Sequence, residues 1–256
     1  MVDEKFIRTA MLIGEEGIEK LKKSSVTVFG VGGVGSFTAE ALARSGVGKI
    51  TVVDYDTISE SNINRQSHAF TDTVGEIKVE EMKRRIERIN PDIDVRAVNI
   101  MMNKDNIDEI MSEGADYAVD AIDMVSSKIA LIEYCCSRDI PVISAMGAGN
   151  KLNPAMLEVS DIHSTSVCPL ARVMRREMRN RNIEKLKVVY SKEKPVEPIN
   201  PEMLKGEKFS EESSEGADGK SGGNKRVPGS TAFVPSVSGL IIASEVVKDL
   251  IGYEDL

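Results

Sequence analysis

The amino-acid sequence predicts an α/β fold with a Rossmann-like, mainly parallel sheet, helices on both of its faces, and a small C-terminal extension. Three observations support this prediction. Short runs of β-branched and aromatic residues alternate with longer runs of helical periodicity. A glycine-rich turn joins the first of these strands to the helix after it. Such alternation is typical of a parallel sheet, since each crossover helix returns the chain for another strand in the same direction.

The first predicted strand, Ser25 to Phe29, is a β-branched run that ends in glycines. The helix after it runs from Gly35 to Ser45 and ends at Gly46. An amphipathic pattern from Glu76 to Ile89 predicts another helix, which ends at Asn90 because the residue before a proline avoids helical geometry. Further strands are expected at Ile50 to Val53, Ile93 to Val98, Tyr117 to Ile122 and Ile140 to Ser144.

The pattern changes after a second glycine-rich turn, residues 147–149, so we expect a first domain of residues 1–150 and an extension of residues 151–256. Asn150 to Asp161 is expected to be extended or a hairpin, and Pro169 to Asn182 to be a strongly basic helix. Residues 206–226 are polar and glycine-rich and predict a mobile loop. Ser236 to Ile251 returns to an apolar helical pattern, which predicts a C-terminal helix that docks on the core.

The composition limits the class of protein. The 41% hydrophobic and 29% charged fractions are those of a soluble globular protein, and no apolar run approaches the roughly 20 residues that span a bilayer. The first residues lack the basic and apolar regions of a secretory signal. Three cysteines cannot pair completely, so a reducing cytoplasm fits best. The net charge of -8 argues against indiscriminate nucleic-acid binding but not against a local basic patch.

A nucleotide site is predicted at the turn between the first strand and its helix. The segment GVGGVG fits the G-x-G-x-x-G pattern with Gly30, Gly32, Gly33 and Gly35. Glycines there permit a tight turn and a close approach of phosphate, and the helix N-terminus offers free N–H groups. Asp54 ends the next strand, where a carboxylate accepts hydrogen bonds from ribose hydroxyls. This context favours nucleotide binding over a tight turn without a ligand.

Polar residues around this turn favour ATP over a nicotinamide cofactor. They are Asn62, Arg65 and Gln66 after the second strand, Lys78 at the next helix, and Asp123 after the fourth strand. A hydride donor does not need two cations and a second carboxylate near its phosphates. Cleavage between the α- and β-phosphates of ATP does, because charge develops on the leaving pyrophosphate and Mg²⁺ needs an oxygen ligand. Taken singly, Arg65 and Lys78 could be solvated charges and Asp123 a helix N-cap.

Together these motifs resemble the ubiquitin-activating-enzyme-like superfamily of ThiF, MoeB and HesA type, whose bacterial members adenylate carboxylates. The resemblance covers most of residues 8–150 and includes the glycine loop, Asp54, Asn62-x-x-Arg65-Gln66, Gly75-x-x-Lys78 and Asp120-Ala-x-Asp123. It implies that Arg65 and Lys78 contact the ATP phosphates, that Asn62 lies at the same site, and that Asp123 is the magnesium ligand. Arg8 matches an arginine that members donate into the ATP site of the other subunit, so the resemblance also implies a homodimer.

Two classes of carboxylate substrate compete. Members that activate the C-terminal glycine of a ubiquitin-like sulfur-carrier protein usually carry two Cys-x-x-Cys pairs that bind structural zinc. The cysteines here are Cys135, Cys136 and Cys168, so no four-thiolate zinc site is expected. The first two lie in an apolar helical pattern and are interpreted as core residues. Adenylation of a sulfur carrier stays the alternative function, and a non-catalytic nucleotide-binding module is disfavoured because the phosphate-site cations and Asp123 are intact.

The sequence is similar over more segments to the tRNA threonylcarbamoyladenosine dehydratases. The shared segments are Ser45 to Gly48, Asn62-x-Asn64-Arg65-Gln66-x-His68-Ala69, Asp120 to Asp123, Ala148-Gly149 and Asp161 to Arg176. The resemblance implies a ligase-type enzyme that adenylates the threonyl carboxylate of the modified adenosine beside the tRNA anticodon. A nitrogen of the carbamoyl group then attacks, expels AMP and closes a ring, with the net loss of water. No enzyme nucleophile is required, which agrees with the few cysteines.

An independent physical feature favours RNA as the partner. Arg172, Arg175, Arg176 and Arg179 are spaced i, i+3, i+4 and i+7, which places them along one face of a helix. Glu177 is the sole opposite charge in residues 170–183, so RNA phosphate contact is favoured over an ordinary solvated helix face. The sequence leaves open which tRNAs are bound, whether Cys168 has a role, and whether a sulfur-transfer protein is a partner.

Overall fold

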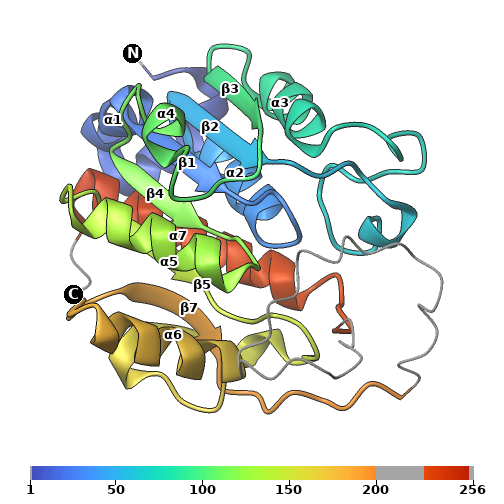
Figure 1. The fold of residues 1–256 in the computed structure, drawn as a ribbon. Coiled ribbons are helices and arrows are strands. Elements are labelled where there is room, and N and C mark those ends of the chain that lie inside the picture. The colour runs from blue at the N-terminus through green and yellow to red at the C-terminus, as the bar shows by residue number, and fades with distance from the viewer. Residues whose placement is uncertain (1, 200–227, 254–256) are drawn as a thin grey trace.

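A seven-stranded sheet forms the centre of the fold (Figure 1). The structure is a computed structural model and describes residues 2–199 and 228–253. The strands lie in the order β3-β2-β1-β4-β5-β7-β6. Each neighbouring pair is parallel except β6 and β7, which are antiparallel. The predicted Rossmann-like, mainly parallel sheet is therefore confirmed.

The elements follow the expected alternation of strands and helices. The strands are β1 (Ser25–Phe29), β2 (Lys49–Asp54), β3 (Asp94–Asn99), β4 (Tyr117–Asp120), β5 (Val142–Ala145), β6 (Leu157–Asp161) and β7 (Lys187–Ser191). The α-helices are α1 (Ile7–Lys23), α2 (Gly35–Ser45), α3 (Lys78–Ile89), α4 (Ile107–Ile110), α5 (Val125–Cys136), α6 (Pro169–Asn180) and α7 (Val234–Ile251). The loop predicted over residues 206–226 lies outside the described residues.

Helices cover both faces of the sheet, as the sequence predicted. α1, α2, α3 and α7 pack on one face, while α5 and α6 pack on the other. Figure 1 shows α5 in front of α7, and the two helices contribute to different core clusters, one on each face of the sheet. This arrangement encloses the strands and leaves the turns at their carboxyl ends to form a site.

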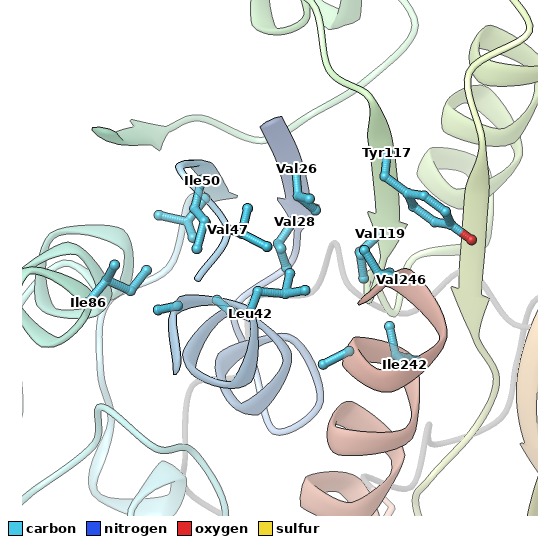
Figure 2. Close-up of a cluster of buried hydrophobic side chains, with 14 of the residues drawn as sticks. Val26, Val28, Leu42, Val47, Ile50, Ile86, Tyr117, Val119, Ile242 and Val246 are labelled. Carbon is cyan, nitrogen blue, oxygen red and sulfur yellow. The ribbon is translucent and has the colours of Figure 1, made fainter. Parts of the chain in front are cut away.

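The core forms where β-branched residues of the central strands meet aliphatic residues of the helices. Figure 2 shows Val26 and Val28 of β1, Ile50 of β2 and Val119 of β4 against Leu42 of α2, Ile86 of α3, and Ile242 and Val246 of α7. Each of these side chains is at most 1% exposed. Full burial of one such side chain contributes about 1.5–3 kcal/mol. The packing therefore fixes the positions of β1, β2 and β4 and of the turns that leave them.

Two strand boundaries differ from the prediction by two residues, each for a local reason. β4 ends at Asp120, before the predicted end at Ile122, because the Asp120 carboxylate accepts the Ile122 N–H at 3.2 Å and turns the chain. β5 begins at Val142, after the predicted start at Ile140, and the intervening Pro141 has no N–H to donate.

The chain after residue 150 extends the sheet beyond β5. β7 pairs in parallel with β5, and β6 pairs with β7 and forms the edge. α7 then returns to the centre and packs on α2, where Thr38 donates to Gly239 O at 3.1 Å. The division into domains at residue 150 stays a prediction. In the part of the chain that the structure describes, no helix is both long and apolar enough to cross a membrane.

Candidate active site

The carboxyl ends of β1, β2 and β4 meet where the strand order reverses. β2 and β3 lie on one side of β1, and β4 and β5 lie on the other. Open parallel sheets bind ligands in the crevice beyond the strand ends at such a reversal. The turns that leave these three strands carry the residues predicted to bind a nucleotide.

The glycine loop after β1 packs tightly against the turn after β4. A Cβ on Gly30, whose φ is +84°, would lie 2.6 Å from Ala121 O, and a Cβ on Gly35 would lie 1.8 Å from Gly30 O. Both positions require glycine, since a side chain would collide with backbone. A Cβ on Gly32 would instead meet no atom closer than Gln66 Nε2, at 3.9 Å. The middle of the loop is therefore open to a ligand.

The loop leads directly into α2, and the N–H groups of its first turn point back toward the loop, where that of Ser36 donates to Gly32 O at 3.1 Å. Gly33 is covered by the side chains of Pro235 and Arg65. A Cβ at Gly33 would lie 3.2 Å from Pro235 Cβ and 3.3 Å from Arg65 Cγ. The start of α7 and the Arg65 side chain thus close one side of the loop. The positive end of the α2 dipole favours an anion at the open side.

Asp54, at the end of β2, binds the glycine loop. Its carboxylate accepts the N–H of Val31 at 2.8 Å and that of Asp56 at 3.0 Å. Burial raises the pKa of the Asp54 carboxyl above its ordinary value, and the nearby Lys78 ammonium offsets only part of this rise. The two hydrogen bonds fix the orientation of the carboxylate, which has further lone pairs for hydroxyl donors. The structure thus brings Asp54 and the glycine loop together.

Lys78 begins α3 and is buried, with 5% of its surface exposed. Its ammonium donates to Asp56 Oδ2 at 2.7 Å. A buried ammonium needs a counterion, and Asp56 supplies one. The Asp56 side chain is 44% exposed, so this carboxylate can turn to solvent when another anion arrives. Lys78 therefore lies at the end of β2 with an exchangeable counterion.

Asn62 and Arg65 lie in the segment that follows β2. Asn62 is buried, and its Oδ1 accepts the Ser59 N–H at 3.1 Å, so this side chain caps a short 3₁₀ turn. Arg65 Nη1 donates to Ser61 O and to Asn64 Oδ1, both at 2.9 Å. These bonds hold the guanidinium close to its own segment, beside the glycine loop.

Gln66 and His68 carry buried polar atoms without a partner among the described residues, and Gln66 lies next to that loop. Gln66 is 6% exposed, and its Oε1 has no hydrogen-bond partner among the described residues. His68 is 1% exposed, and neither of its ring nitrogens has a partner in the described part of the chain. Burial lowers the pKa of His68 to about 3, with the positive charges of Lys78 and Arg85 acting in the same direction. His68 is therefore a neutral imidazole at pH 7.

Asp123 lies in the turn between β4 and α5 and is exposed. The Ala121 N–H donates to Phe29 O at 2.8 Å, which joins this turn to the end of β1. Within residues 2–199 and 228–253, no three His, Cys, Asp or Glu side chains cluster as metal ligands. Mg²⁺ bound by one carboxylate and the phosphates of a nucleotide needs no such cluster. Asp123 fits an ion of that kind.

The residues also fit a nucleotide. The glycine loop is open at Gly32, the Gln66 acceptor lacks a partner within the described part of the chain, and the Lys78 counterion borders solvent. An anionic ligand with hydroxyl groups would satisfy all three.

Arg8 lies far from the glycine loop of its own chain. The neighbouring Phe6 ring packs at Gly46, 3.6 Å from the position of an added Cβ, and Gly46 follows the last residue of α2. The glycine loop lies at the other end of α2, which spans about 16 Å at 1.5 Å per residue. Arg8 is exposed, and the structure does not bring it to the other predicted site residues.

The α6 arginines divide into two groups. Arg172, Arg176 and Arg179 are exposed. Arg175 is half-buried and donates from Nη1 to Thr165 Oγ1 at 2.8 Å and to Thr165 O. In this structure Arg175 therefore braces the turn before α6, while the other three arginines form the exposed stripe.

Two cysteines that the sequence placed in the core have different environments. Cys135 is buried, but Cys136 is exposed, because adjacent residues of a helix point in directions about 100° apart. Burial raises the pKa of the Cys135 thiol to about 12, so this side chain stays protonated at pH 7.

Sequence reasoning missed Asp56 and Lys128. The signal for Asp56 was its spacing from Asp54, since a second carboxylate follows directly after the end of β2. Lys128 is 0% exposed and pairs with Asp120, also 0% exposed, at 2.9 Å. Its signal was a lone lysine within the apolar pattern of α5.

Comparisons with known proteins agree with this geometry. The sequence model of the ThiF family matches residues 6–256. Over 247 residues the chain is 44% identical to the tRNA threonylcarbamoyladenosine dehydratase of Bacillus subtilis (strain 168), an alignment that covers 96% of this chain and 94% of that relative. The chain belongs to the ThiF family, among the tRNA threonylcarbamoyladenosine dehydratases.

Solved structures resemble this ThiF-family chain over nearly its whole length. The E. coli tRNA N6-threonylcarbamoyladenosine dehydratase in complex with AMP is 34% identical, with a TM-score of 0.83 over 97% of this chain and 94% of that one. The same enzyme in complex with ATP is 33% identical, with a TM-score of 0.82 over the same shares of the two chains. The fold of this ThiF-family member is therefore that of the dehydratases.

Proposed function

We propose that this chain is an ATP-dependent, ligase-type enzyme that dehydrates threonylcarbamoyladenosine in tRNA, next to the anticodon. The observation that carries this proposal is the meeting of an open glycine loop, a buried lysine and an exposed carboxylate at the ends of β1, β2 and β4. The threonyl carboxylate attacks the α-phosphate of ATP and pyrophosphate leaves. A carbamoyl nitrogen then attacks the activated carbonyl, AMP leaves, and a ring forms with the net loss of water.

The nucleotide is held mainly by backbone and by Asp54. The N–H groups of the glycine loop and of the start of α2 bind phosphate oxygens. Asp54, whose orientation is fixed by Val31 and Asp56, accepts hydrogen bonds from the ribose hydroxyls. Asn62 and Gln66 are two of the buried polar side chains of the adjoining segment.

The positive charges act where negative charge develops. Lys78 and Arg65 stabilise the phosphates as the bond between the α- and β-phosphates breaks. Asp123 would hold Mg²⁺, which supplies further positive charge to the same phosphates. The buried position of Lys78 strengthens its interaction, since solvent screens it little.

The proposal includes a homodimer in which Arg8 reaches the partner's nucleotide. Its support is the distance of Arg8 from its own glycine loop and the apolar surface around it. Ile7, Met11 and Leu12 of the same helix are 47%, 80% and 87% exposed. Adjacent exposed apolar side chains of this kind mark protein interfaces. A second copy of the chain would bury them and bring Arg8 to a site.

The stripe of Arg172, Arg176 and Arg179 is proposed to bind tRNA phosphates. The three are spaced i, i+4 and i+7 and are exposed, while Val173, Met174 and Met178 bury the opposite side of α6. This geometry holds the charges on a rigid surface.

A cytoplasmic location is part of the proposal. Its support is that Cys135, Cys136 and Cys168 are all free thiols in the structure.

The direct test is nucleoside mass analysis of tRNA that carries threonylcarbamoyladenosine, after incubation with the protein and ATP. The proposal expects a mass loss of one water on that nucleoside, with release of AMP and pyrophosphate. An unchanged nucleoside, together with adenylation of the C-terminal glycine of a sulfur-carrier protein, would replace this proposal by the alternative.

A further inference from the structure

A fully buried ion pair lies directly behind the turn that carries Asp123. Asp120 ends β4 and Lys128 lies in α5, on the face of the sheet opposite α7 (Figure 1). Lys128 Nζ lies 2.9 Å from Asp120 Oδ2, and neither side chain is exposed. The function proposed above assigns no task to either residue.

The Lys128 ammonium joins three separate segments of the chain. Besides Asp120, it donates to Ile122 O at 3.0 Å and to Ala145 O at 2.9 Å. Ile122 belongs to the turn after β4, and Ala145 is the last residue of β5. The three N–H bonds of the ammonium thus each have an acceptor.

Asp120 holds the same turn from its other side. Its Oδ1 accepts the Ile122 N–H at 3.2 Å, and its Oδ2 accepts the Ser144 hydroxyl at 2.5 Å. Both the N–H and the C=O of Ile122 are therefore bonded to the ion pair. Ile122 directly precedes Asp123, so these two bonds restrict the backbone that carries the Asp123 carboxylate.

The ion pair also holds the turn against the glycine loop. Ala121 O lies where it leaves no room for a Cβ on Gly30, and the Ala121 N–H donates to Phe29 O at 2.8 Å. A shift of this turn would move Asp123 relative to the loop that binds phosphate.

Stability alone does not explain an ion pair at this place. Removing two charges from water is costly, and well-packed apolar residues of similar volume are often as stabilising or more so. An apolar pair could not, however, bind Ile122 O and Ala145 O. The particular contribution of Lys128 is its set of donors to the backbone.

We infer that Lys128 is a positioning residue, which sets the Asp123 carboxylate for a magnesium-bound nucleotide by holding the turn of residues 121–123. The identity of the ligand in this inference rests on the proposed function. The statement that Lys128 holds the turn is independent of that function.

The test uses the double variant Asp120→Asn/Lys128→Met in the full chain. Lys128→Met alone would leave a buried carboxylate without a counterion and could unfold the protein. Asn at 120 keeps one acceptor oxygen for the Ile122 N–H, and its NH2 group can donate to the Ser144 hydroxyl oxygen, so the double variant removes the Lys128 donors without leaving a buried charge. The matched control is Lys187→Met/Asp249→Asn, which neutralises a pair 2.7 Å apart between β7 and α7, on the opposite face of the sheet from α5.

Two measurements decide the outcome. Hydrogen exchange of the ligand-free variant should be at least about tenfold faster in residues 118–124, with β1 and α7 unchanged. Calorimetric titration without metal should give an affinity of the double variant for ATP within about twofold of wild type. Titrations at increasing Mg²⁺ should show that the concentration at which Mg²⁺ half-maximally enhances ATP affinity is raised about tenfold, as for other residues that orient a metal ligand. The control pair should change neither.

Unchanged local exchange, or exchange accelerated equally over the whole chain, would overturn the inference, since Lys128 would then be an ordinary contributor to stability. So would an unchanged Mg²⁺ dependence. A wild-type protein that binds no ATP at all would instead defeat the proposed function, while the exchange measurement would still decide whether Lys128 holds the turn.

Discussion

Lys78 Nζ and Asp56 Oδ2 lie 2.7 Å apart, with the lysine side chain 7% exposed and the aspartate side chain 44% exposed. The ammonium is enclosed while its counterion borders solvent. A phosphate can therefore take the place of the carboxylate without leaving a buried charge unpaired. This relationship suits a lysine that is charged before the nucleotide arrives and needs little rearrangement to bind it.

Replacing this lysine should weaken phosphate binding specifically. In Lys78→Met the affinity for ATP should fall at least about tenfold, because a hydrogen bond to a charged group is worth about 1.5–3 kcal/mol. The affinity for adenosine should stay within about twofold of wild type. Calorimetry on both ligands checks this. Lys83→Met, at a half-exposed position of the same helix, is the control. An equal loss for ATP and adenosine would mean that the substitution had damaged the fold.

Asp123→Asn should impair turnover more than binding. The proposed ion serves charge that develops during the reaction, so the single-turnover rate should fall about 10²–10³-fold while ATP binds within a few-fold of wild type. Rapid-quench measurement of AMP release, beside calorimetry, separates the two effects. Asp105→Asn, an exposed carboxylate on another loop, should change neither. Parallel losses of rate and affinity would count against a role for Asp123 in the reaction itself.

Subunit mixing tests whether Arg8 acts in a second copy of the chain. Arg8→Ala and Asp123→Ala should each be inactive alone. A mixed dimer, however, has one site with both Asp123 and a partner's Arg8, so exchange of subunits should restore part of the activity. Native mass spectrometry monitors the exchange. If mixed dimers form and activity stays absent, Arg8 does not act across the interface.

The exposed α6 stripe should control the affinity for tRNA and its salt dependence. In Arg172→Glu/Arg176→Glu the affinity should fall, and the slope of log affinity against log salt should become shallower by about one unit for each lost phosphate contact. ATP binding should stay unchanged. Titrations of tRNA at two salt concentrations measure this, with Lys83→Glu/Arg84→Glu on α3 as a control of equal charge change. Loss of ATP binding with intact tRNA affinity would assign α6 to the nucleotide site instead.

His68 should make the protein less stable in mild acid. Its pKa is lowered to about 3 from an ordinary value of 6.5, so between these values the unfolded chain binds the proton more readily. The free energy of unfolding should therefore fall as the pH drops below 6.5, by up to about 1.4 kcal/mol per pH unit from this group. His68→Leu should remove that part of the slope. Urea unfolding from pH 7 to pH 4 measures it, and identical slopes for both proteins would contradict this account.

Features that depend on periodicity and strand direction could be predicted from the sequence. The β-branched runs and the glycines around α2 give the strand and helix positions, and parallel strands bring Asp54 and the glycine loop to one edge. Contacts between side chains could not be predicted in this way. The spacing of Arg175 puts it on the basic face, but periodicity does not reveal that Thr165 lies within its reach. Likewise, nothing in the α5 pattern shows that Lys128 meets a carboxylate and two carbonyl groups.

The central claim is that a carboxylate of the tRNA nucleoside is activated by adenylation. The most direct test uses threonylcarbamoyladenosine whose threonyl carboxylate carries heavy oxygen. If this carboxylate attacks the α-phosphate and AMP is then expelled by the carbamoyl nitrogen, the released AMP should carry one heavy oxygen and the pyrophosphate none. Heavy oxygen in inorganic phosphate, with ADP as the other product, would contradict adenylation. Ring closure with unlabelled AMP would also contradict it.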